Sequence, residues 1–318
     1  MTTPGVSVIV PARNSLAHVQ ALVEALAVQT VPTTEFELVL ADDGSTDGTL
    51  EWLEAQSRPW IRVVPGPPLN SYAARNRAVA ASRGSVLAFC DADCVPDRDW
   101  LERGLQALEK ADIVAGRVRF IVPKRRTVWT LLDMDSSKDH EREVRNATAE
   151  TANLVLRRTL YDLVGGFEED IPEFGDFDFV QRAVASGANL AFGDDVVVWH
   201  PTRDKAKPFL RAHWIYSRGY GVREGEASRI PSDLRWRALV PVVSVLRTRR
   251  WWGRSIGPDR RWLGENGVTP TRVETLLSLP LLYLFLPYFR AAAQFTGWRE
   301  GRRTRQSTGS SQAARHHG

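Results

Sequence analysis

The sequence predicts an α/β fold in which helices cover both faces of a mostly parallel sheet, followed by a basic helical region. Over the first 120 or so residues, short apolar runs rich in β-branched side chains alternate with segments of helical apolar spacing. These runs are continuous, not alternating, which is typical of strands buried on both faces. A chain of 318 residues that is 43% hydrophobic and 25% charged can also bury a substantial core.

The elements follow in order along the chain. We expect strands at 6–10, 36–41, 61–64, 85–90 and 112–118. We expect helices between them, at 18–29, about 47–56, 72–82 and about 98–110. Parallel strands joined in this way have right-handed crossovers. Because ligands bind at the carboxyl ends of such strands, the residues that follow each strand are the candidates for function.

The charge is divided unevenly along the chain. Residues 1–200 carry 20 Lys and Arg against 30 Asp and Glu, whereas residues 201–318 carry 22 against 8 and hold six of the eleven tryptophans. This division predicts an acidic folded domain, at 1–204, whose chemistry is with cations, and a basic helical region at 205–305 that faces an anionic partner. The last residues, 306–318, are low in apolar content and are expected to be disordered.

The basic region has the composition of a segment that lies in a membrane interface. Residues 235–255 combine an apolar middle with Arg and Trp flanks. The longest charge-free apolar run, 275–289, has 15 residues and two prolines, whereas a spanning helix needs about 20. We therefore expect interfacial or re-entrant attachment to an anionic membrane surface, which leaves open whether 275–298 insert. The alternative is that these runs dock on the catalytic domain.

The amino-terminal sequence and the cysteines bear on location. The start, "MTTPGVSVIVPARN", lacks the basic and apolar regions of a signal peptide. The two cysteines are too few and too close together for a disulfide framework. Together with the membrane prediction, this favours the cytoplasmic face of the plasma membrane.

Polar clusters follow three of the predicted strands. They are "PARN" (11–14), "DDGSTDGT" (42–49) and "DADC" (91–94). The second suits a tight turn into a helix that starts near Asp47. Loops of this kind also arise for purely structural reasons, but three of them at one sheet edge, two of them acidic, indicate a ligand site.

Asp91 and Asp93 end a buried strand, and side chains two residues apart point the same way if the strand continues. Two adjacent carboxylates repel each other electrostatically unless a cation lies between them. Mg²⁺ or Mn²⁺ commonly binds through one or two carboxylates plus substrate phosphates. We interpret the pair as a metal site; the alternative is two solvated loop aspartates. Cys90 and Cys94 are interpreted as inert packing thiols, because a hard cation prefers oxygen.

In its ordered motifs the chain resembles a family 2 glycosyltransferase of the GT-A fold, a Rossmann-like sheet flanked by helices. The resemblance covers roughly residues 5–201 and is carried by "VSVIVPARN", "LVLADDGSTDGT", "AARNRAVAASRGSVLAFCDADCVPDRDWL", "ETANLVLRRTLYDLVGGFEED", "FGDFDFVQRAVASG" and "VVVWHP". It implies an inverting, membrane-associated enzyme of bacterial type, with a nucleotide-binding half at about 1–118 and an acceptor half at 119–204. UDP is the commonest donor nucleotide of the family, with dTDP and GDP left open.

The resemblance also implies the residues of the nucleotide pocket. Asp43 would bind the base, and the backbone at Pro11, Ala12 and Arg13 would wall the same pocket. Arg75 would lie nearby.

Further implied residues lie on the diphosphate side. Asp91 would contact the ribose side of the donor, Asp93 would be the metal ligand of the DxD motif, and His200 would help at the metal or the diphosphate. Arg218 is a candidate diphosphate contact, because "HWIYSRGYG" (213–221) has the glycines of a mobile loop.

Asp176 falls on the catalytic base of the family's Glu-Asp motif, although Gly175 stands where Glu is common. Asp178 is expected to be structural, at the start of a helix. A carboxylate base and one metal suffice for inversion, with the base removing the proton of the acceptor hydroxyl.

Three functions therefore compete. The first is metal-dependent transfer of a sugar to a hydroxyl of a lipid-linked or cell-envelope glycan. The second is a polyprenyl-phosphate glycosyltransferase, whose phosphate acceptor has less need of a base. The third is nucleic-acid binding through the basic region, which the acidic first part of the chain and the absence of a recognised motif disfavour. The sugar, the acceptor and the oligomeric state are left open.

Overall fold

The computed structural model describes residues 4–136, 139–171, 173–231, 260–281 and 285–315. The expected interfacial segment 235–255 therefore lies outside the described residues. The chain forms two compact units, each described here by itself: Met1–Ile121 with Lys138–Pro201, and Val122–Ser137 with Thr202–Gly318. The second unit thus includes residues 122–137, which the resemblance assigns to the acceptor half.

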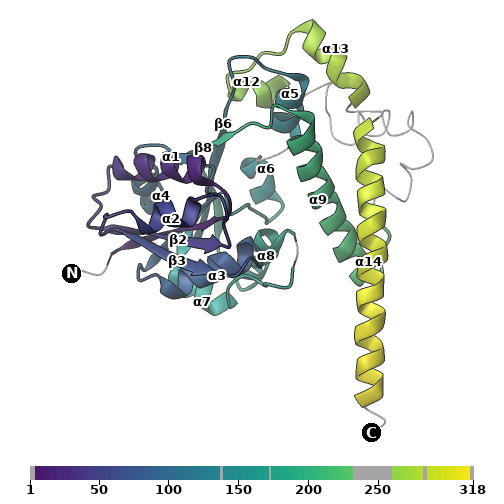
Figure 1. The fold of residues 1–318 in the computed structure, drawn as a ribbon, viewed down its shortest axis with the longest axis horizontal. Helices are drawn as coiled ribbons and strands as arrows, with labels where there is room; N and C mark the ends of the chain where they lie inside the picture. Colours follow the sequence, from purple (N-terminus) through teal and green to yellow (C-terminus); the bar gives the residue numbers. More distant parts are fainter. Residues whose placement is uncertain (1–3, 137–138, 172, 232–259, 282–284, 316–318) are drawn as a thin grey trace. The chain divides into compact units, whose positions relative to one another are not determined.

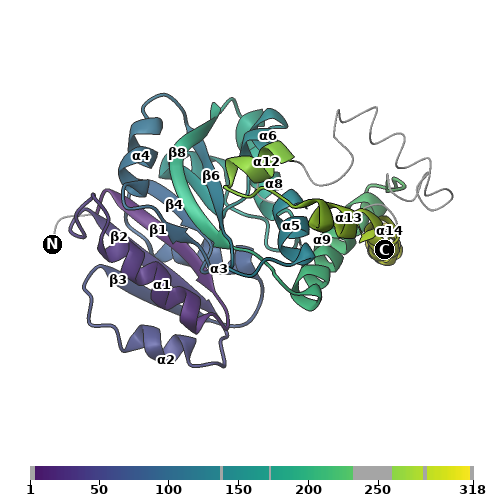
Figure 2. The same ribbon diagram turned by 90° about the horizontal axis from the view of Figure 1, so that it is seen from above.

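The first unit is built on one mixed sheet (Figures 1 and 2). The strands are β1 (Val6–Ala12), β2 (Phe36–Asp43), β3 (Ile61–Gly66), β4 (Val86–Cys90), β5 (Val95–Pro96), β6 (Ile113–Ile121), β7 (Asn153–Arg157) and β8 (Leu190–Pro201). Their order in the sheet is β3-β2-β1-β4-β7-β6-β8-β5. The first four pair in parallel, β7 is antiparallel to both of its neighbours, and β8 is parallel to β6. The five strands expected from the sequence are confirmed as β1 to β4 and β6.

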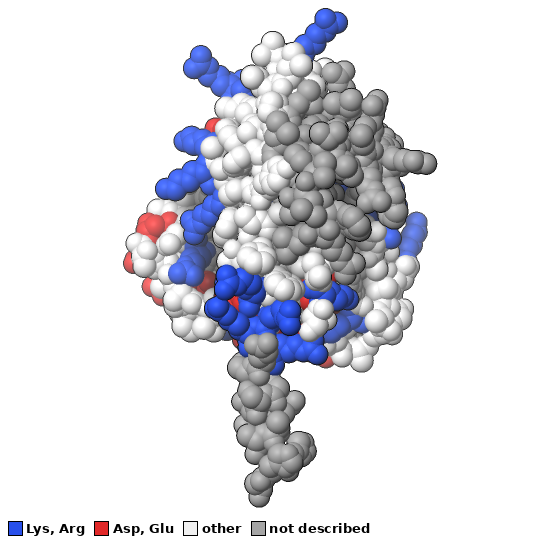
Figure 3. Space-filling view, turned by 90° about the vertical axis from the view of Figure 1, so that its right-hand side faces the viewer, with Lys and Arg blue, Asp and Glu red and all other residues white. Residues whose placement is uncertain are grey.

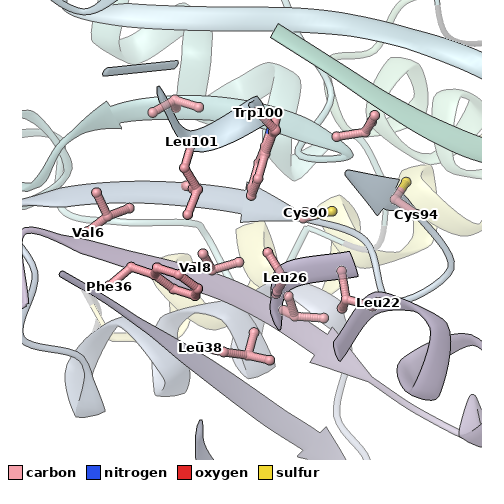
Figure 4. Close-up of a cluster of buried hydrophobic side chains, with 14 of the residues drawn as sticks. Val6, Val8, Leu22, Leu26, Phe36, Leu38, Cys90, Cys94, Trp100 and Leu101 are labelled. Carbon is pink, nitrogen blue, oxygen red and sulfur yellow. The ribbon is translucent and has the colours of Figure 1, made fainter. Parts of the chain in front are cut away.

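Helices cover both faces of this sheet, as expected for continuously apolar strands. They are α1 (Leu16–Ala27), α2 (Thr49–Glu54), α3 (Ser71–Ala81), α4 (Trp100–Ala107), α6 (His140–Arg145), α7 (Arg158–Val164) and α8 (Gly175–Ala185). Alternate side chains of β1 enter two different cores. Val8 packs in the core that contains residues of α1, α2 and α4, part of which Figure 4 shows, whereas Ile9 packs with α3, α7 and α8.

Asn153 connects three elements inside this unit. Its side chain is fully buried, donates to the carbonyls of Arg117 (3.0 Å) and Val196 (2.8 Å), and accepts from Trp100 Nε1 (2.9 Å). These bonds satisfy backbone carbonyls at the irregularity where the β6–β8 register shifts after Gly116. Beyond the shift, β8 continues in register with β6 as far as Pro201, which carries His200 to the end of the strand.

The second unit is helical. It consists of α5 (Val128–Ser136), α9 (Ala206–Glu226), α12 (Arg260–Glu265), α13 (Arg272–Pro280) and α14 (Leu286–Arg315). A small core joins Leu132 of α5, Phe209 of α9 and Leu286 of α14. Residues 306–315, expected to be disordered, are instead the last turns of α14. They contain no proline, and the helix continues through them to Arg315.

The segment 213–221 is part of α9, so the expectation of a mobile loop there is wrong. Its glycines serve close packing of two helices instead. A Cβ atom at Gly221 would meet the backbone carbonyl of Gln294, and one at Gly297 would meet that of Arg218. Gly225 and Gly301 extend the same contact by one turn, so α9 and α14 touch backbone to backbone.

Candidate active site

The sheet topology gathers the sequence-predicted residues at one edge. The carboxyl ends of β1, β2 and β4 lie together because these strands are parallel. The antiparallel strand β7 has its amino end there, where Asn153 pairs with Cys90. The strands β6 and β8 again run parallel to β4, so His200 arrives at this edge from the other half of the sheet.

The loops after β1 and β2 are tied to each other. The backbone N–H of Asn14 donates to Ser45 Oγ (2.9 Å), and Asn14 Oδ1 accepts from the N–H of Thr46 (2.8 Å). Asp42 Oδ2 accepts from the N–H groups of Gly44 and Ser45, both at 3.0 Å, which shapes the turn. The polar cluster 42–49 therefore has a structural role, and the same bonds hold the two loops at a fixed spacing.

Asp43 lies at the end of β2 with its carboxylate buried. Its Oδ1 accepts from the N–H of Leu69 (3.0 Å), and its Oδ2 lies 3.8 Å from NH1 of Arg13, whose side chain is half exposed. Pro11 and Ala12 pair with Ala41 and Asp42 in the adjacent strand. The structure thus brings Pro11, Ala12, Arg13 and Asp43 together, as the resemblance implies.

Arg75 joins this region to the carboxylate loop after β4. Helix α3 begins at Ser71 because Asn70 caps it, accepting from two N–H groups with Oδ1 at 2.9 Å. One turn later the buried guanidinium of Arg75 donates to Asp91 Oδ1 at 2.7 Å and lies 5.8 Å from the Tyr72 ring. Among the described residues, Arg75 Nε is buried without a hydrogen-bond partner.

Asp93 and His200 meet from opposite halves of the sheet. His200 Nε2 lies 3.5 Å from Asp93 Oδ2, with the imidazole buried and the carboxylate partly exposed. Ligand atoms of Asp91, Asp93 and Cys94 all lie within 4.8 Å of one another. Carboxylate oxygens and an imidazole nitrogen form a donor set that fits Mn²⁺ or Mg²⁺.

The two cysteines do not add to that donor set. Both thiols are free and buried. A hydrogen bond with Cys90, together with burial, raises the pKa of the Cys94 thiol well above its usual value. A protonated thiol is a poor ligand for a hard cation, which agrees with a packing role for these residues.

Asp176 lies in the first turn of helix α8 and is partly buried. Its Oδ1 accepts from the N–H of Phe177 (3.0 Å), and its Oδ2 accepts from the N–H of Thr151 (3.3 Å). Burial, reinforced by the negative charge of Glu150, raises the pKa of Asp176 to about 6, although Arg75 and the two N–H groups act in the opposite direction. A carboxylate in this state can accept a proton near neutral pH.

Tyr72 and Glu150 are two site residues that the sequence analysis missed. Tyr72 is buried, and its pKa is raised well beyond the usual range by burial and then by the charge of Asp176. Its ring also accounts for Gly175, because a Cβ atom there would lie 2.9 Å from the ring. Tyr72 precedes Arg75 by three residues on a predicted helix, so its face could have been recognised. Glu150 is the first residue of the matched motif "ETANLVLRRTLYDLVGGFEED", but the sequence analysis gave it no role.

Two further residues from the sequence analysis have identified partners. Asp178 forms an ion pair with Arg182 (2.8 Å), and that guanidinium also donates to the carbonyls of Val164 and Gly166. Arg218 belongs to the helical unit, where its NH2 lies 2.6 Å from Glu300 Oε1, and its role as a diphosphate contact stays a prediction.

Comparisons with known proteins agree on one family. A family model described as glycosyl transferase family 2 matches residues 7–166. Glycosyltransferase AglE of Haloferax volcanii is 34% identical over 208 residues, which cover 64% of this chain and 68% of that protein. TarS of Staphylococcus aureus, a poly(ribitol-phosphate) beta-N-acetylglucosaminyltransferase, is 36% identical over 105 residues, or 30% of this chain and 17% of that protein. Two other curated relatives are longer, and the chain spans 25% and 55% of them.

Solved structures show the same fold. Mannosyltransferase PcManGT of Pyrobaculum calidifontis, solved with GDP-Man and Mn²⁺, has a TM-score of 0.55 and 17% identity, covering 96% of this chain and 87% of that chain. A fragment of S. aureus TarS in complex with UDP-GlcNAc has a TM-score of 0.52 and 18% identity, covering 95% of this chain and 92% of that chain. The α/β fold expected from the sequence is confirmed.

Proposed function

The chain belongs to glycosyl transferase family 2, and from that premise we propose that it transfers a sugar, with inversion, from a nucleotide-diphosphate sugar to a hydroxyl of a lipid-linked or cell-envelope glycan. The observation that carries this proposal is the partly buried carboxylate of Asp176, which accepts from the N–H groups of Thr151 and Phe177 and whose pKa is raised to about 6. Arg75 relates that carboxylate to the donor-side residues, because it bonds to Asp91 and also lowers the pKa of Asp176.

The donor side is proposed to hold a UDP-sugar. Asp43 would accept a hydrogen bond from the base, with Pro11, Ala12 and Arg13 beside it, and Asp91 would face the ribose. Support comes from the meeting of these residues at one sheet edge and from TarS, which was solved with UDP-GlcNAc. Since PcManGT was solved with GDP-Man, the nucleotide must be tested directly.

Asp93 and His200 are the residues proposed to hold Mn²⁺ or Mg²⁺. Their 3.5 Å separation and the adjacent Asp91 carboxylate support this assignment. When bound, the ion would supply positive charge against the diphosphate leaving group. Arg75 would supply a second, fixed positive charge, and its buried Nε is the donor that would face an anionic group.

In the proposed step the acceptor hydroxyl gives its proton to the Asp176 carboxylate while its oxygen bonds to the anomeric carbon. The bond between that carbon and the terminal phosphate oxygen breaks, and its electron pair leaves with the nucleoside diphosphate. Because attack comes from the face opposite the leaving group, the configuration inverts and no covalent enzyme intermediate forms.

The donor is tested by thermal stabilisation with UDP, GDP, dTDP and CMP, each with and without Mn²⁺. A ligand that binds only the folded chain raises the unfolding midpoint by mass action. We expect one diphosphate to stabilise the wild type only with the metal, and Asp93→Asn to lose that effect. Asp99→Asn, which alters a surface ion pair with Arg103, is the matched control. No shift with any nucleotide would contradict the proposal.

The base is tested with Asp176→Asn. The matched control is Asp178→Asn, which removes another carboxylate from the same helix. We expect Asp176→Asn to reduce transfer to a hydroxyl acceptor by about 10²- to 10⁴-fold while nucleotide binding persists, and Asp178→Asn to retain most activity. Transfer to a polyprenyl phosphate that survives Asp176→Asn would instead favour the phosphate-acceptor alternative, because a phosphate oxygen is already anionic.

A further inference from the structure

Helix α13 exposes an apolar face that the transferase reaction does not use. Val273, Leu276 and Leu277 are 65%, 65% and 60% exposed. Their spacing places them on one side of the helix. We call these three residues the α13 ridge. Such a concentration of large apolar side chains in a nine-residue helix is unusual for a surface that faces water.

The ridge is presented by a well-anchored helix. Thr271 and Glu274 form a capping box, with Thr271 Oγ1 accepting from the N–H of Glu274 (3.2 Å) and Glu274 Oε2 accepting from the N–H of Thr271 (2.7 Å). Arg126 donates to both carboxylate oxygens of Glu274, each at 3.3 Å. The exposed face therefore belongs to an ordered helix that is held to the segment before α5.

Positive charge surrounds the ridge. Arg272 is exposed on α13 itself, and Lys124 and Arg125 are exposed in the segment that Arg126 ties to the helix. Residues 122–127 and 271–280 together contain four basic residues and one acidic residue, Glu274, which Arg126 already neutralises. The basic side chains complement an anionic partner. The apolar ridge fits a partner whose interior, beneath the anionic surface, is apolar.

We propose that the α13 ridge docks on the surface of an anionic lipid bilayer, with the leucines in the headgroup–acyl boundary and the exposed side chains of Lys124, Arg125 and Arg272 on lipid phosphates. A shallow contact fits a short helix with one apolar face. Among the residues that the structure describes, no helix is both long and apolar enough to cross a bilayer. This inference goes beyond the proposed reaction and does not depend on it.

A second face of the same unit has similar chemistry. On α14, away from the glycine contact with α9, Tyr288 and Phe295 are exposed, and Arg299 and Arg302 lie over the rings of Phe295 (5.8 Å) and Trp298 (5.1 Å). Exposed aromatics followed by arginines are typical of interfacial segments. Figure 3 shows a band of Lys and Arg side chains on the α14 side, with few Asp or Glu among them.

The test is co-sedimentation of the full chain with vesicles. Vesicles of phosphatidylcholine alone are compared with vesicles in which about one third of the lipid is phosphatidylglycerol. We expect binding at least about tenfold tighter to the anionic vesicles. This readout needs neither donor nor acceptor, so its failure would be distinguishable from failure of the proposed transferase reaction.

Three variants identify the surface. Leu276→Glu/Leu277→Glu should weaken binding by more than about tenfold, since it removes the inserted side chains and adds negative charge. Lys124→Gln/Arg125→Gln should weaken it by roughly fivefold for each charge removed. The matched control is Leu163→Glu, because Leu163 is 72% exposed on α7 of the first unit and lies outside the ridge. It should bind as the wild type does.

Each other outcome overturns the proposal. Wild-type binding that ignores lipid charge, or that survives the leucine double variant, would exclude the ridge as the docking surface. A lower unfolding midpoint for that variant without lipid would mean that another protein segment covers the ridge. Binding to a single-stranded oligonucleotide that excludes vesicles and persists without the leucines would assign the basic surface to nucleic acid instead.

Discussion

His200 Nε2 lies 3.5 Å from Asp93 Oδ2, so a residue of β8 completes a cluster that begins after β4. At the proposed metal site, this imidazole would either ligate the ion directly or orient the carboxylate that does. In both cases loss of the imidazole would weaken binding of the ion.

We therefore expect His200→Ala to weaken Mn²⁺ affinity by roughly 10- to 100-fold. The measurement is the Mn²⁺ concentration that gives half of the nucleotide-dependent thermal stabilisation. His18→Ala, at an exposed position on α1, should leave that concentration unchanged. An unchanged value in His200→Ala as well would exclude a role for His200 at the metal.

Arg75 is predicted to be required for stability as well as for the site. Its buried guanidinium donates to Asp91 at 2.7 Å, and Arg75→Met would leave a partly buried carboxylate without that partner. We expect a loss of about 3 kcal/mol in the free energy of unfolding, measured by urea denaturation. Arg103→Met breaks a more exposed ion pair with Asp99 and should change stability little. Equal effects of the two variants would contradict this reasoning.

The raised pKa of Asp176 predicts opposite pH dependences of stability and activity. The pKa is raised from 3.8 in the unfolded chain to about 6, so the folded chain binds the proton more tightly and wild-type stability falls as pH rises from about 4 to about 6. Asp176→Asn has no ionisable group at this position, so its stability should not fall in this way. Its stability relative to the wild type should therefore improve by up to about 3 kcal/mol between pH 4 and pH 7.

Activity should change in the other direction, because only the ionised carboxylate can accept the acceptor proton. We expect wild-type kcat/KM to rise through an apparent pKa of about 6 as pH increases. The measurements are urea denaturation at several pH values for both proteins and a pH–rate profile for the wild type. A stability difference that stays constant with pH would refute the raised pKa.

The glycine contact between α9 and α14 can be tested by a single methyl group. In Gly297→Ala the new Cβ would meet the backbone carbonyl of Arg218, which cannot rotate away as a side chain could. We expect a loss of about 1–3 kcal/mol in the free energy of unfolding. Gly264→Ala is the matched control, because nothing lies within 4 Å of a Cβ there, and it should be neutral or slightly stabilising. A neutral Gly297→Ala would mean that the helices do not pack this closely.

The order of strands and helices over the first 120 or so residues was predictable from local pattern. Runs such as 6–10 and 36–41 are buried on both faces. Burial on both faces requires apolar side chains at successive positions, and the sequence shows them directly. The position of the polar residues after these strands was also predictable, because the direction of parallel strands places them at one edge of the sheet. Asp43, Asp91 and Asp93 could therefore be selected as candidates without the tertiary structure.

The glycines of 213–221 show where local pattern misleads. Glycine permits both a mobile loop and a close helix contact, and the difference depends on whether Gly297 and Gly301 of another helix lie opposite. The sequence around 213–221 contains no information about that distant helix, which explains the mistaken expectation.

By itself, then, the sequence determined the strands β1 to β4 and β6, the helices between them and the carboxylates that follow the strands, because each follows from the periodicity and chemistry of neighbouring residues. Only the tertiary structure decided that His200 reaches Asp93, that the Tyr72 ring occupies the space beside Gly175, and that Glu150 raises the pKa of Asp176. These relations join residues distant in the chain through sheet order and burial. Both are properties of the packed fold, and no short stretch of sequence contains them.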